Sequence, residues 1–249
     1  MSKSSNKNIL ITGSSNGLGY NLAKIFIDNG NKVFINGLSK KNVSIRCKEL
    51  NTEGMACDVT KENDCNKLIK SAEKYLGNID VLVCNVGSGS SVPIGNETLK
   101  EWKRVFDLNF FSTVNTVNAL IKNSKSSKVS IICVSSICGH EYIPGAPATY
   151  SVAKSALNNY INIYSKYIVK YNYRLNGIIC GNIMFPGSSW EKKLKGKNYS
   201  FKKKILEDVS VDRFAEPMDI YDVIWLLSKD NTFINGSLLM VDGGQTRSF

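Results

Sequence analysis

Tyr150 and Lys154 are the two side chains whose types and spacing indicate proton chemistry. They occur in the string "YSVAK", and residues four apart lie on the same face of a helix. A free tyrosine has a pKa of about 10, which is too high for an efficient general base near neutral pH. A nearby ammonium stabilises the phenolate and lowers that pKa. Tyr150 could then exchange a proton with an alcohol or carbonyl oxygen while a hydride moves at the carbon.

A second feature is the glycine-rich stretch "NILITGSSNGLGYNLAKIF", which runs from residue 8 to residue 26. Gly13, Gly17 and Gly19 lie between a short apolar run and an amphipathic pattern, as in a strand that turns into a helix. Backbone N–H groups exposed at such a helix N-terminus could bind a phosphate. The alternative is a glycine-rich turn that binds no ligand.

Short apolar runs alternate with longer helical patterns along the whole chain. This alternation predicts an α/β fold with a parallel sheet and helices on both faces. Residues 1–249 are expected to form one domain, with an irregular segment at about 181–212 beside the sheet. The predicted strands are Ile9–Thr12, Lys32–Asn36, Gly54–Cys57, Val81–Asn85, Ser130–Ser135, Leu175–Cys180 and Ser237–Val241. The predicted helices are Gly19–Asn29, Glu62–Leu76, Leu99–Ile121, Ala148–Tyr171 and Pro217–Leu227.

Several motifs follow one another in a fixed order along these elements. They are the T-G-x-x-x-G-x-G turn, "DVT" at 58–60, "CNVG" at 84–87, "LNF" at 108–110, "VSSICG" at 134–139, "YSVAK" at 150–154 and "VDGG" at 241–244. In this set and order the chain resembles the short-chain dehydrogenase/reductase family, in its single-domain form, over essentially its whole length. The resemblance implies a Rossmann-type doubly wound, seven-stranded parallel sheet. It also implies NAD(P)-dependent interconversion of a carbonyl and a secondary alcohol.

The resemblance assigns roles to four catalytic residues. Tyr150 would be the acid/base, and Lys154 would tune its pKa and contact the ribose. Ser136 would hydrogen-bond the substrate oxygen, and Asn109 would anchor a water relay to the lysine. The alternative is that Ser136 is a polar cap at a strand end and Tyr150 is a packed aromatic residue.

The cofactor contacts implied by the resemblance lie at the carboxyl ends of several strands. The glycine turn would hold the pyrophosphate, Asp58 and Val59 the adenine, and Ile183 the nicotinamide carboxamide. The usual P-G after the sixth strand is Cys180–Gly181 here, which leaves the backbone path over the nicotinamide open. The full predicted set is Gly13, Ser15, Asn16, Gly17, Leu18, Gly19, Asp58, Val59, Asn85, Gly87, Tyr150, Lys154 and Ile183.

The end of the second strand, "KVFINGLSKKN", bears on the choice between NAD and NADP. An acidic side chain there would bind the ribose hydroxyls and repel a 2′-phosphate, and residues 31–42 contain none. Lys40 and Lys41 could meet the phosphate, which favours NADP. Asn16 and Leu38, however, stand where NADP-using relatives often carry arginine, so NAD remains the alternative.

A lysine cluster in the irregular segment bears on the substrate. Seven of the thirteen residues from Lys192 to Lys204 are lysine, in the segment where the family builds a lid. They form either a solvated surface or a site for an anionic substrate. The strings "GNIMFPGSSW" and "VDGGQTRSF" resemble oxidoreductases of bacterial surface-polysaccharide synthesis, which favours a sugar derivative. A 3-ketoacyl-carrier-protein reductase is the alternative within the same chemistry.

Composition excludes some other classes of function. The seven cysteines are odd in number and scattered without C-x-x-C spacing, which predicts no metal site and reduced thiols in a cytoplasm. His140 is the only histidine, which excludes a histidine-pair mechanism. No run approaches the ~18 apolar residues of a membrane span.

The net charge of +11 is dispersed and does not favour nucleic-acid binding. A nucleic-acid-binding module and a non-catalytic cofactor sensor stay as alternatives. A small-molecule substrate and a homo-oligomer, either a tetramer or a dimer, are the partners that the resemblance implies.

Overall fold

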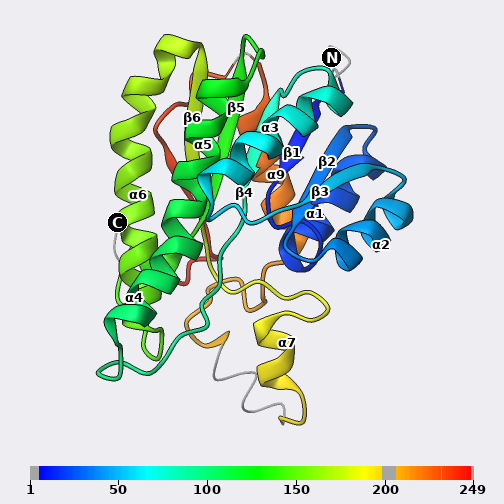
Figure 1. Cartoon of the computed structure of the whole chain (residues 1–249). Coiled ribbons are helices and arrows are strands. Elements are labelled where there is room, and N and C mark those ends of the chain that lie inside the picture. The colour runs from blue at the N-terminus through cyan, green and yellow to red at the C-terminus, as the bar shows by residue number, and fades with distance from the viewer. Residues whose placement is uncertain (1–5, 198–205, 231, 248–249) are drawn as a thin grey trace.

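A seven-stranded parallel sheet forms the middle layer of the structure (Figure 1). The computed structural model describes residues 6–197, 206–230 and 232–247. The strands lie in the order β3-β2-β1-β4-β5-β6-β7. The first three strands extend the sheet to one side of β1 and the later four to the other side, and folds of this kind bind ligands at such a switch point between β1 and β4. The bounds are β1 Asn8–Ile11, β2 Lys32–Gly37, β3 Glu53–Ala56, β4 Val81–Cys84, β5 Val129–Ser136, β6 Tyr173–Cys180 and β7 Leu238–Val241.

Helices cover both faces of this sheet. One face carries α1 (Gly17–Asp28), α2 (Lys40–Leu50) and α9 (Pro217–Ser228). The other face carries α3 (Glu62–Leu76), α4 (Leu99–Phe106), α5 (Ser112–Asn123) and α6 (Ala148–Ile168). The short helix α7 (Ser189–Leu194) projects beyond the sheet, in the segment predicted to be irregular (Figure 1). The doubly wound architecture predicted from the sequence is therefore confirmed.

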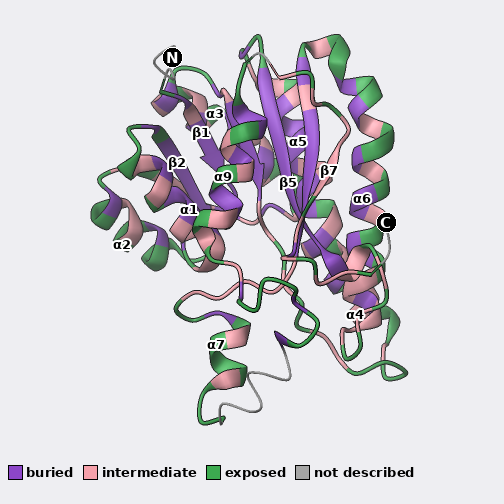
Figure 2. Ribbon diagram, turned by 180° about the vertical axis from the view of Figure 1, so that it is seen from behind, coloured by how far each residue is buried: buried purple, intermediate pink, exposed green. Residues whose placement is uncertain are grey.

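Alternation along the strands explains the two layers. In β1, Leu10 packs toward α3 and α5, while Ile9 and Ile11 pack toward α1 and α9, because successive strand residues point to opposite faces. All three are fully buried, and Figure 2 shows the same burial along the central strands. Each such side chain stabilises the fold by about 1.5–3 kcal/mol relative to exposure.

Two helical regions differ from the sequence prediction. The helix expected over Leu99–Ile121 is interrupted by a π-helical turn at Asp107–Phe111, which separates α4 from α5. Helix α2 was not predicted, because its sequence is rich in lysine and only Val43 and Leu50 are buried along it. The seven predicted strands agree with the structure to within two residues at each end.

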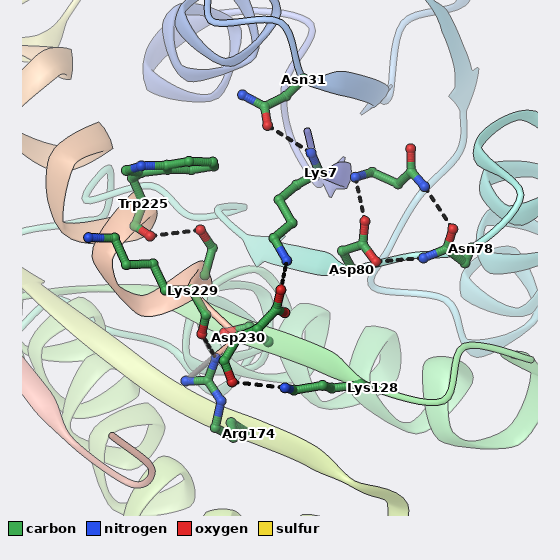
Figure 3. A network of polar contacts seen from close by, with 12 residues as sticks. Lys7, Asn31, Asn78, Asp80, Lys128, Arg174, Trp225, Lys229 and Asp230 are labelled. Carbon is green, nitrogen blue, oxygen red and sulfur yellow. Dashed lines mark hydrogen bonds and ion pairs between the residues drawn. The ribbon is translucent and has the colours of Figure 1, made fainter. Parts of the chain in front are cut away.

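A polar network closes the amino end of the sheet, opposite the predicted site (Figure 3). The Lys7 ammonium lies 2.6 Å from the Asp230 carboxylate, and Lys128 donates to the Asp230 carbonyl oxygen at 2.8 Å. Arg174 donates to the carbonyl oxygen of Lys229 at 2.9 Å. These contacts fasten the chain before β1 to the chain that leaves α9.

None of the described helices is long and apolar enough to span a bilayer. All seven cysteines are free. Among the described residues, no group of histidine, cysteine, aspartate or glutamate could hold a metal ion.

Candidate active site

The glycine turn between β1 and α1 requires glycine at three positions. Gly13 and Gly17 have φ angles of +64° and +60°, which side chains rarely adopt. A Cβ at Gly13 would lie 2.9 Å from the side chain of Val86. A Cβ at Gly19 would lie 2.5 Å from both Asn85 Nδ2 and the carbonyl oxygen of Gly13. The turn is therefore packed tightly against the end of β4.

The start of α1 has the features of a phosphate site. Asn16 is the N-cap residue, but its side chain makes no capping hydrogen bond, and the first turn carries no acidic residue. The backbone N–H groups and the positive end of the helix dipole therefore remain available to an anion. The nearest atom to a Cβ on Gly17 would be Phe185 Cε2, at 3.8 Å. This arrangement fits the pyrophosphate of a dinucleotide.

Two asparagines fix this turn to its neighbours. Asn85 Nδ2 donates to the carbonyl oxygens of Thr12 and Gly13 at 3.1 and 3.2 Å. Asn36, which is 1 % exposed at the end of β2, accepts from the Gly13 N–H at 3.2 Å and donates to the Cys57 carbonyl. Asn85 was predicted as a cofactor residue, and its side chain positions the turn. Asn36 was missed, although a polar residue within an apolar strand was a signal for it.

Tyr150 and Lys154 lie on one face of α6, as their spacing predicts. Lys154 is 3 % exposed, and its ammonium lies 6.0 Å from the centroid of the Tyr150 ring. The ammonium donates to the carbonyl oxygen of Val134 in β5 at 2.8 Å. Burial lowers the pKa of Lys154 to about 8, so it stays protonated at neutral pH.

Ser136 ends β5 beside the Tyr150 phenol. Burial raises the pKa of Tyr150, and hydrogen bonding to the Ser136 side chain opposes that rise. The lowered pKa that the sequence predicts from the Lys154 ammonium is therefore wrong for the resting site, because burial outweighs the effects that favour the phenolate. The Ser136 hydroxyl also accepts from the Cys138 N–H at 3.2 Å, so it caps the short helical turn Ile137–Gly139. Ser136 therefore caps the strand end, as the alternative prediction has it, and also lies beside Tyr150, as the catalytic prediction has it.

Asn109 lies in the π-helical turn and faces the same centre. Its Oδ1 accepts from the Ser88 N–H at 2.9 Å, and its Nδ2 donates to the carbonyl oxygens of Ser88 and Val105. A Cβ at Gly87 would lie 2.8 Å from Asn109 Oδ1 and 3.2 Å from Lys154 Nζ. Gly87 thus allows the loop after β4 to pass between the asparagine and the lysine.

Gly139 brings the end of β5 against α6. A Cβ there would lie 2.5 Å from the carbonyl carbon of Lys154 and 2.7 Å from the backbone nitrogen of Ser155. No side chain fits at that distance, so Gly139 sets the approach of Ser136 to the helix that carries Tyr150.

The side of the site predicted for adenosine lies at the ends of β2 and β3. Asp58 Oδ1 accepts from the N–H and hydroxyl of Thr60. The Val59 side chain is buried in the core, so the adenine contact predicted for Val59 would have to come from its backbone. Ser15 is packed against Gly37, and the Arg46 Nε donates to the Ser15 carbonyl oxygen at 3.4 Å. The sequence analysis missed Arg46, because it belongs to the unpredicted helix α2.

The segment after β6 carries the remaining predicted residue. Ile183 pairs with Ala215 in an isolated parallel bridge and packs against the core, which fixes the chain as it leaves the sheet. In α7, the Lys193 ammonium lies over the Trp190 ring at 4.6 Å. Lys202, Lys203 and Lys204 of the predicted lysine cluster lie outside the described residues.

The structure brings the predicted residues to one edge of the sheet. Tyr150, Lys154, Ser136, Asn109 and Gly87 form one centre, and the glycine turn with Asn85 lies beside it. Asp58 and Ile183 lie at the carboxyl ends of β3 and β6.

Comparisons with known proteins identify the family of this chain. Residues 13–246 match a family model described as enoyl-(acyl carrier protein) reductase. The chain is 30% identical over 251 residues to glucose 1-dehydrogenase of Gluconobacter oxydans (strain 621H), covering 96% of this chain and 92% of that protein. It is 28% identical to a 3-oxoacyl-[acyl-carrier-protein] reductase of Chlamydia muridarum, covering 96% and 97%.

A solved structure has the same fold. It is the NADPH-bound short chain oxidoreductase of Pseudomonas aeruginosa PAO1 with an atypical catalytic center, with a TM-score of 0.88 at 20% identity, covering 97% of this chain and 98% of that one. The chain therefore belongs to the short-chain dehydrogenase/reductase family of NAD(P)-dependent oxidoreductases, which interconvert carbonyl and alcohol groups.

Proposed function

We propose that Tyr150 is the acid/base of this oxidoreductase, with Lys154, Ser136 and Asn109 beside it. The observation that carries the proposal is the buried ammonium of Lys154, fixed to β5 on the same face of α6 as Tyr150 and next to Ser136. A bound nicotinamide supplies or accepts the hydride.

The protein side chains handle the proton. Burial keeps the Tyr150 phenol protonated, which is the form that donates to a carbonyl oxygen during reduction. The Lys154 ammonium then stabilises the phenolate. The Ser136 hydroxyl orients the reacting oxygen, and Asn109 holds the loop at Ser88 against the lysine.

NADP is the proposed cofactor, bound along Gly13, Ser15, Asn16, Gly17, Leu18 and Gly19. The end of β2 carries no carboxylate, and α2 begins there with Lys40 and Lys41 in its first turn. A helix N-terminus and two ammonium groups favour the additional phosphate of NADP over a bare ribose. Fluorescence titration with NADPH and NADH tests this. Tighter binding of NADH would contradict it.

The proposed substrate is a sugar derivative, in the setting of surface-polysaccharide synthesis. The similarity to a glucose 1-dehydrogenase supports a sugar, and the exposed lysines of α7 support an anionic one. The similarity to a 3-oxoacyl-[acyl-carrier-protein] reductase supports the second candidate, a 3-ketoacyl thioester on an acidic carrier protein.

A homo-oligomer is proposed as the working state, in the cytoplasm. Three large apolar side chains are exposed on helix α6, and a fourth, Val169, is exposed just beyond its end. A second copy could cover them. The three on the helix are Val152, Ile163 and Tyr167. Seven free cysteines fit a reducing compartment. Light scattering would measure the mass in solution, and a monomer of 27.6 kDa at micromolar concentration would contradict the proposal.

The decisive test is Tyr150→Phe in a screen that follows absorbance of the reduced nicotinamide. The probes are D-glucose, nucleotide-linked sugars and acetoacetyl thioesters, each with both cofactors. We expect the Phe variant to bind NADPH like the wild type and to lose most turnover, because only the hydroxyl is removed. Turnover near the wild-type rate would refute the assigned role. A chain that binds the cofactor and turns over no probe would favour a cofactor sensor. Salt-dependent binding of DNA or RNA would favour a nucleic-acid-binding module.

A further inference from the structure

The loop between β4 and α4, residues 85–98, passes directly over the two central side chains. A Cβ at Gly89 would contact the Tyr150 ring at 3.8 Å, and one at Gly87 would lie 3.2 Å from the Lys154 ammonium nitrogen. The position of this loop therefore decides how much room Tyr150 has.

The outer end of the loop is fastened to the residue before Tyr150. The Ser91 hydroxyl donates to Glu101 Oε1 at 2.7 Å and lies 2.7 Å from the Thr149 hydroxyl. An ionised carboxylate can only accept a hydrogen bond, so the Ser91 hydroxyl donates its one hydrogen to Glu101 and accepts a hydrogen bond from the Thr149 hydroxyl. The hydrogen bonds thus run in one direction, from Thr149 through Ser91 to Glu101.

Arg104 holds the acceptor end of this chain. Its Nε and Nη2 donate to the two Glu101 carboxylate oxygens at 2.8 and 2.7 Å, a bidentate pair. The same Nη2 donates to the Ser90 carbonyl oxygen at 2.9 Å. Hydrogen bonding to Arg104, and then to Ser91, lowers the pKa of Glu101 to about 2, so Glu101 is ionised at neutral pH.

The start of α6 depends on this contact. The N-cap of α6 is Pro147, which offers no side-chain hydrogen bond to the first turn, and that turn contains Tyr150. Thr149 is fully buried, and its hydroxyl meets Ser91. The first turn is therefore tied to α4 through side chains instead of being capped locally.

We propose that Ser91, Thr149, Glu101 and Arg104 are positioning residues for Tyr150, which hold the loop after β4 and the first turn of α6 in one arrangement. The proposal rests on the role of Tyr150 proposed above. A phenol that must meet both a substrate oxygen and Ser136 is sensitive to displacement, since a misplacement of about 1 Å can cost on the order of 100-fold in rate.

The test compares Ser91→Ala, Thr149→Val and the double variant, using the probe that the wild type turns over fastest in the screen above. Each single change should lower kcat about fivefold, the factor for one hydrogen bond, with KM and the dissociation constant for NADPH unchanged. The double variant should lose no more than either single one, because both remove the same link. Thr149→Ser keeps the hydroxyl and should therefore have the kcat of the wild type. Ser127→Ala, an exposed serine beside the amino end of the sheet, is the matched control.

The outcomes separate this proposal from the proposed function. Full activity in Tyr150→Phe would remove the role of Tyr150 itself. An inactive Tyr150→Phe with wild-type kcat in Ser91→Ala would overturn the positioning proposal alone. Losses that multiply in the double variant would also overturn it, since the two hydroxyls would then act separately. Ser91 lies in a partly exposed loop, so its variant keeps the test valid even where Thr149→Val fails to fold.

Discussion

The burial of Lys154 predicts that the free energy of unfolding rises with pH. Lys154 is 3 % exposed, and burial lowers the pKa of its ammonium from 10.5 to about 8. The unfolded chain therefore binds this proton more tightly than the folded chain does. As a result, the protonated lysine destabilises the fold below pH 8, and the penalty shrinks as the pH rises from 8 toward 10.5.

The size of this effect follows from the two pKa values. One pKa unit corresponds to about 1.4 kcal/mol, so raising the pH from 7 to 10 should add about 2–3 kcal/mol to the free energy of unfolding. Lys154→Met keeps an unbranched chain of similar length and removes the titrating group. Titrations of groups remote from Lys154 are common to both proteins and cancel in the comparison. Cys84, Cys138 and Cys180 do not cancel fully, because the Lys154 ammonium lowers the pKa of their thiols in the wild type alone.

Urea unfolding of the cofactor-free proteins between pH 7 and pH 10 measures the effect. The free energy of unfolding of the wild type, minus that of Lys154→Met, should increase by about 2–3 kcal/mol over this range. A difference that does not change with pH would refute the reasoning, because it would mean that the ammonium is hydrated in the folded protein. Loss of turnover in the variant is expected in either case and does not bear on this test.

Three further predictions use other parts of the structure. Gly139→Ala should cost about 1–3 kcal/mol and lower kcat, because its Cβ would meet helix α6 at 2.5 Å. Gly145→Ala strains the backbone at φ +79° but meets no atom within 4 Å, so it should cost stability and keep kcat; equal kcat in the two variants would contradict the assigned clash. Gly17→Val should weaken NADPH binding at least tenfold in a fluorescence titration, because valine does not readily adopt the φ of +60° at the phosphate turn. Unchanged affinity would mean that the glycine serves only the turn. Asp230→Ala should lower the free energy of unfolding in urea by about 1–3 kcal/mol, because it removes the ion-pair partner of the buried Lys7 ammonium. Lys7→Met should lower it by less, and a larger loss in Lys7→Met than in Asp230→Ala would contradict this prediction.

Much of the fold could be read from the sequence because strand signals in a parallel sheet are strong. Each central strand is a short apolar run buried on both faces, such as Val81–Cys84, and each is followed by a turn and a helical pattern. Helix α2 has no such signal. Only Val43 and Leu50 are buried along it, so its apolar periodicity is too weak to detect.

The candidate site could be predicted only as far as its motifs reach. Tyr150 and Lys154 are linked by helical spacing, which the sequence displays directly. Arg46 and Ser91 are brought to the site by tertiary contacts that no local pattern encodes, since each meets a residue more than thirty positions away. The burial that lowers the pKa of Lys154 is likewise a property of the packed molecule.

The π-helical turn at Asp107–Phe111 constrains how this region can change in length. A π turn contains about one residue more than an α turn, and Asn109 is the middle residue of this one. Because the wider turn absorbs its additional residue, deleting one residue there would restore a regular α-helix and would keep α4 and α5 close to their present orientation. Asn109, however, would lose the wider turn that places its side chain against Ser88 in the loop after β4. A one-residue deletion in this turn should therefore preserve the packing of the two helices while disturbing the site, whereas a deletion elsewhere in α4 or α5 would rotate part of the helix by about 100°.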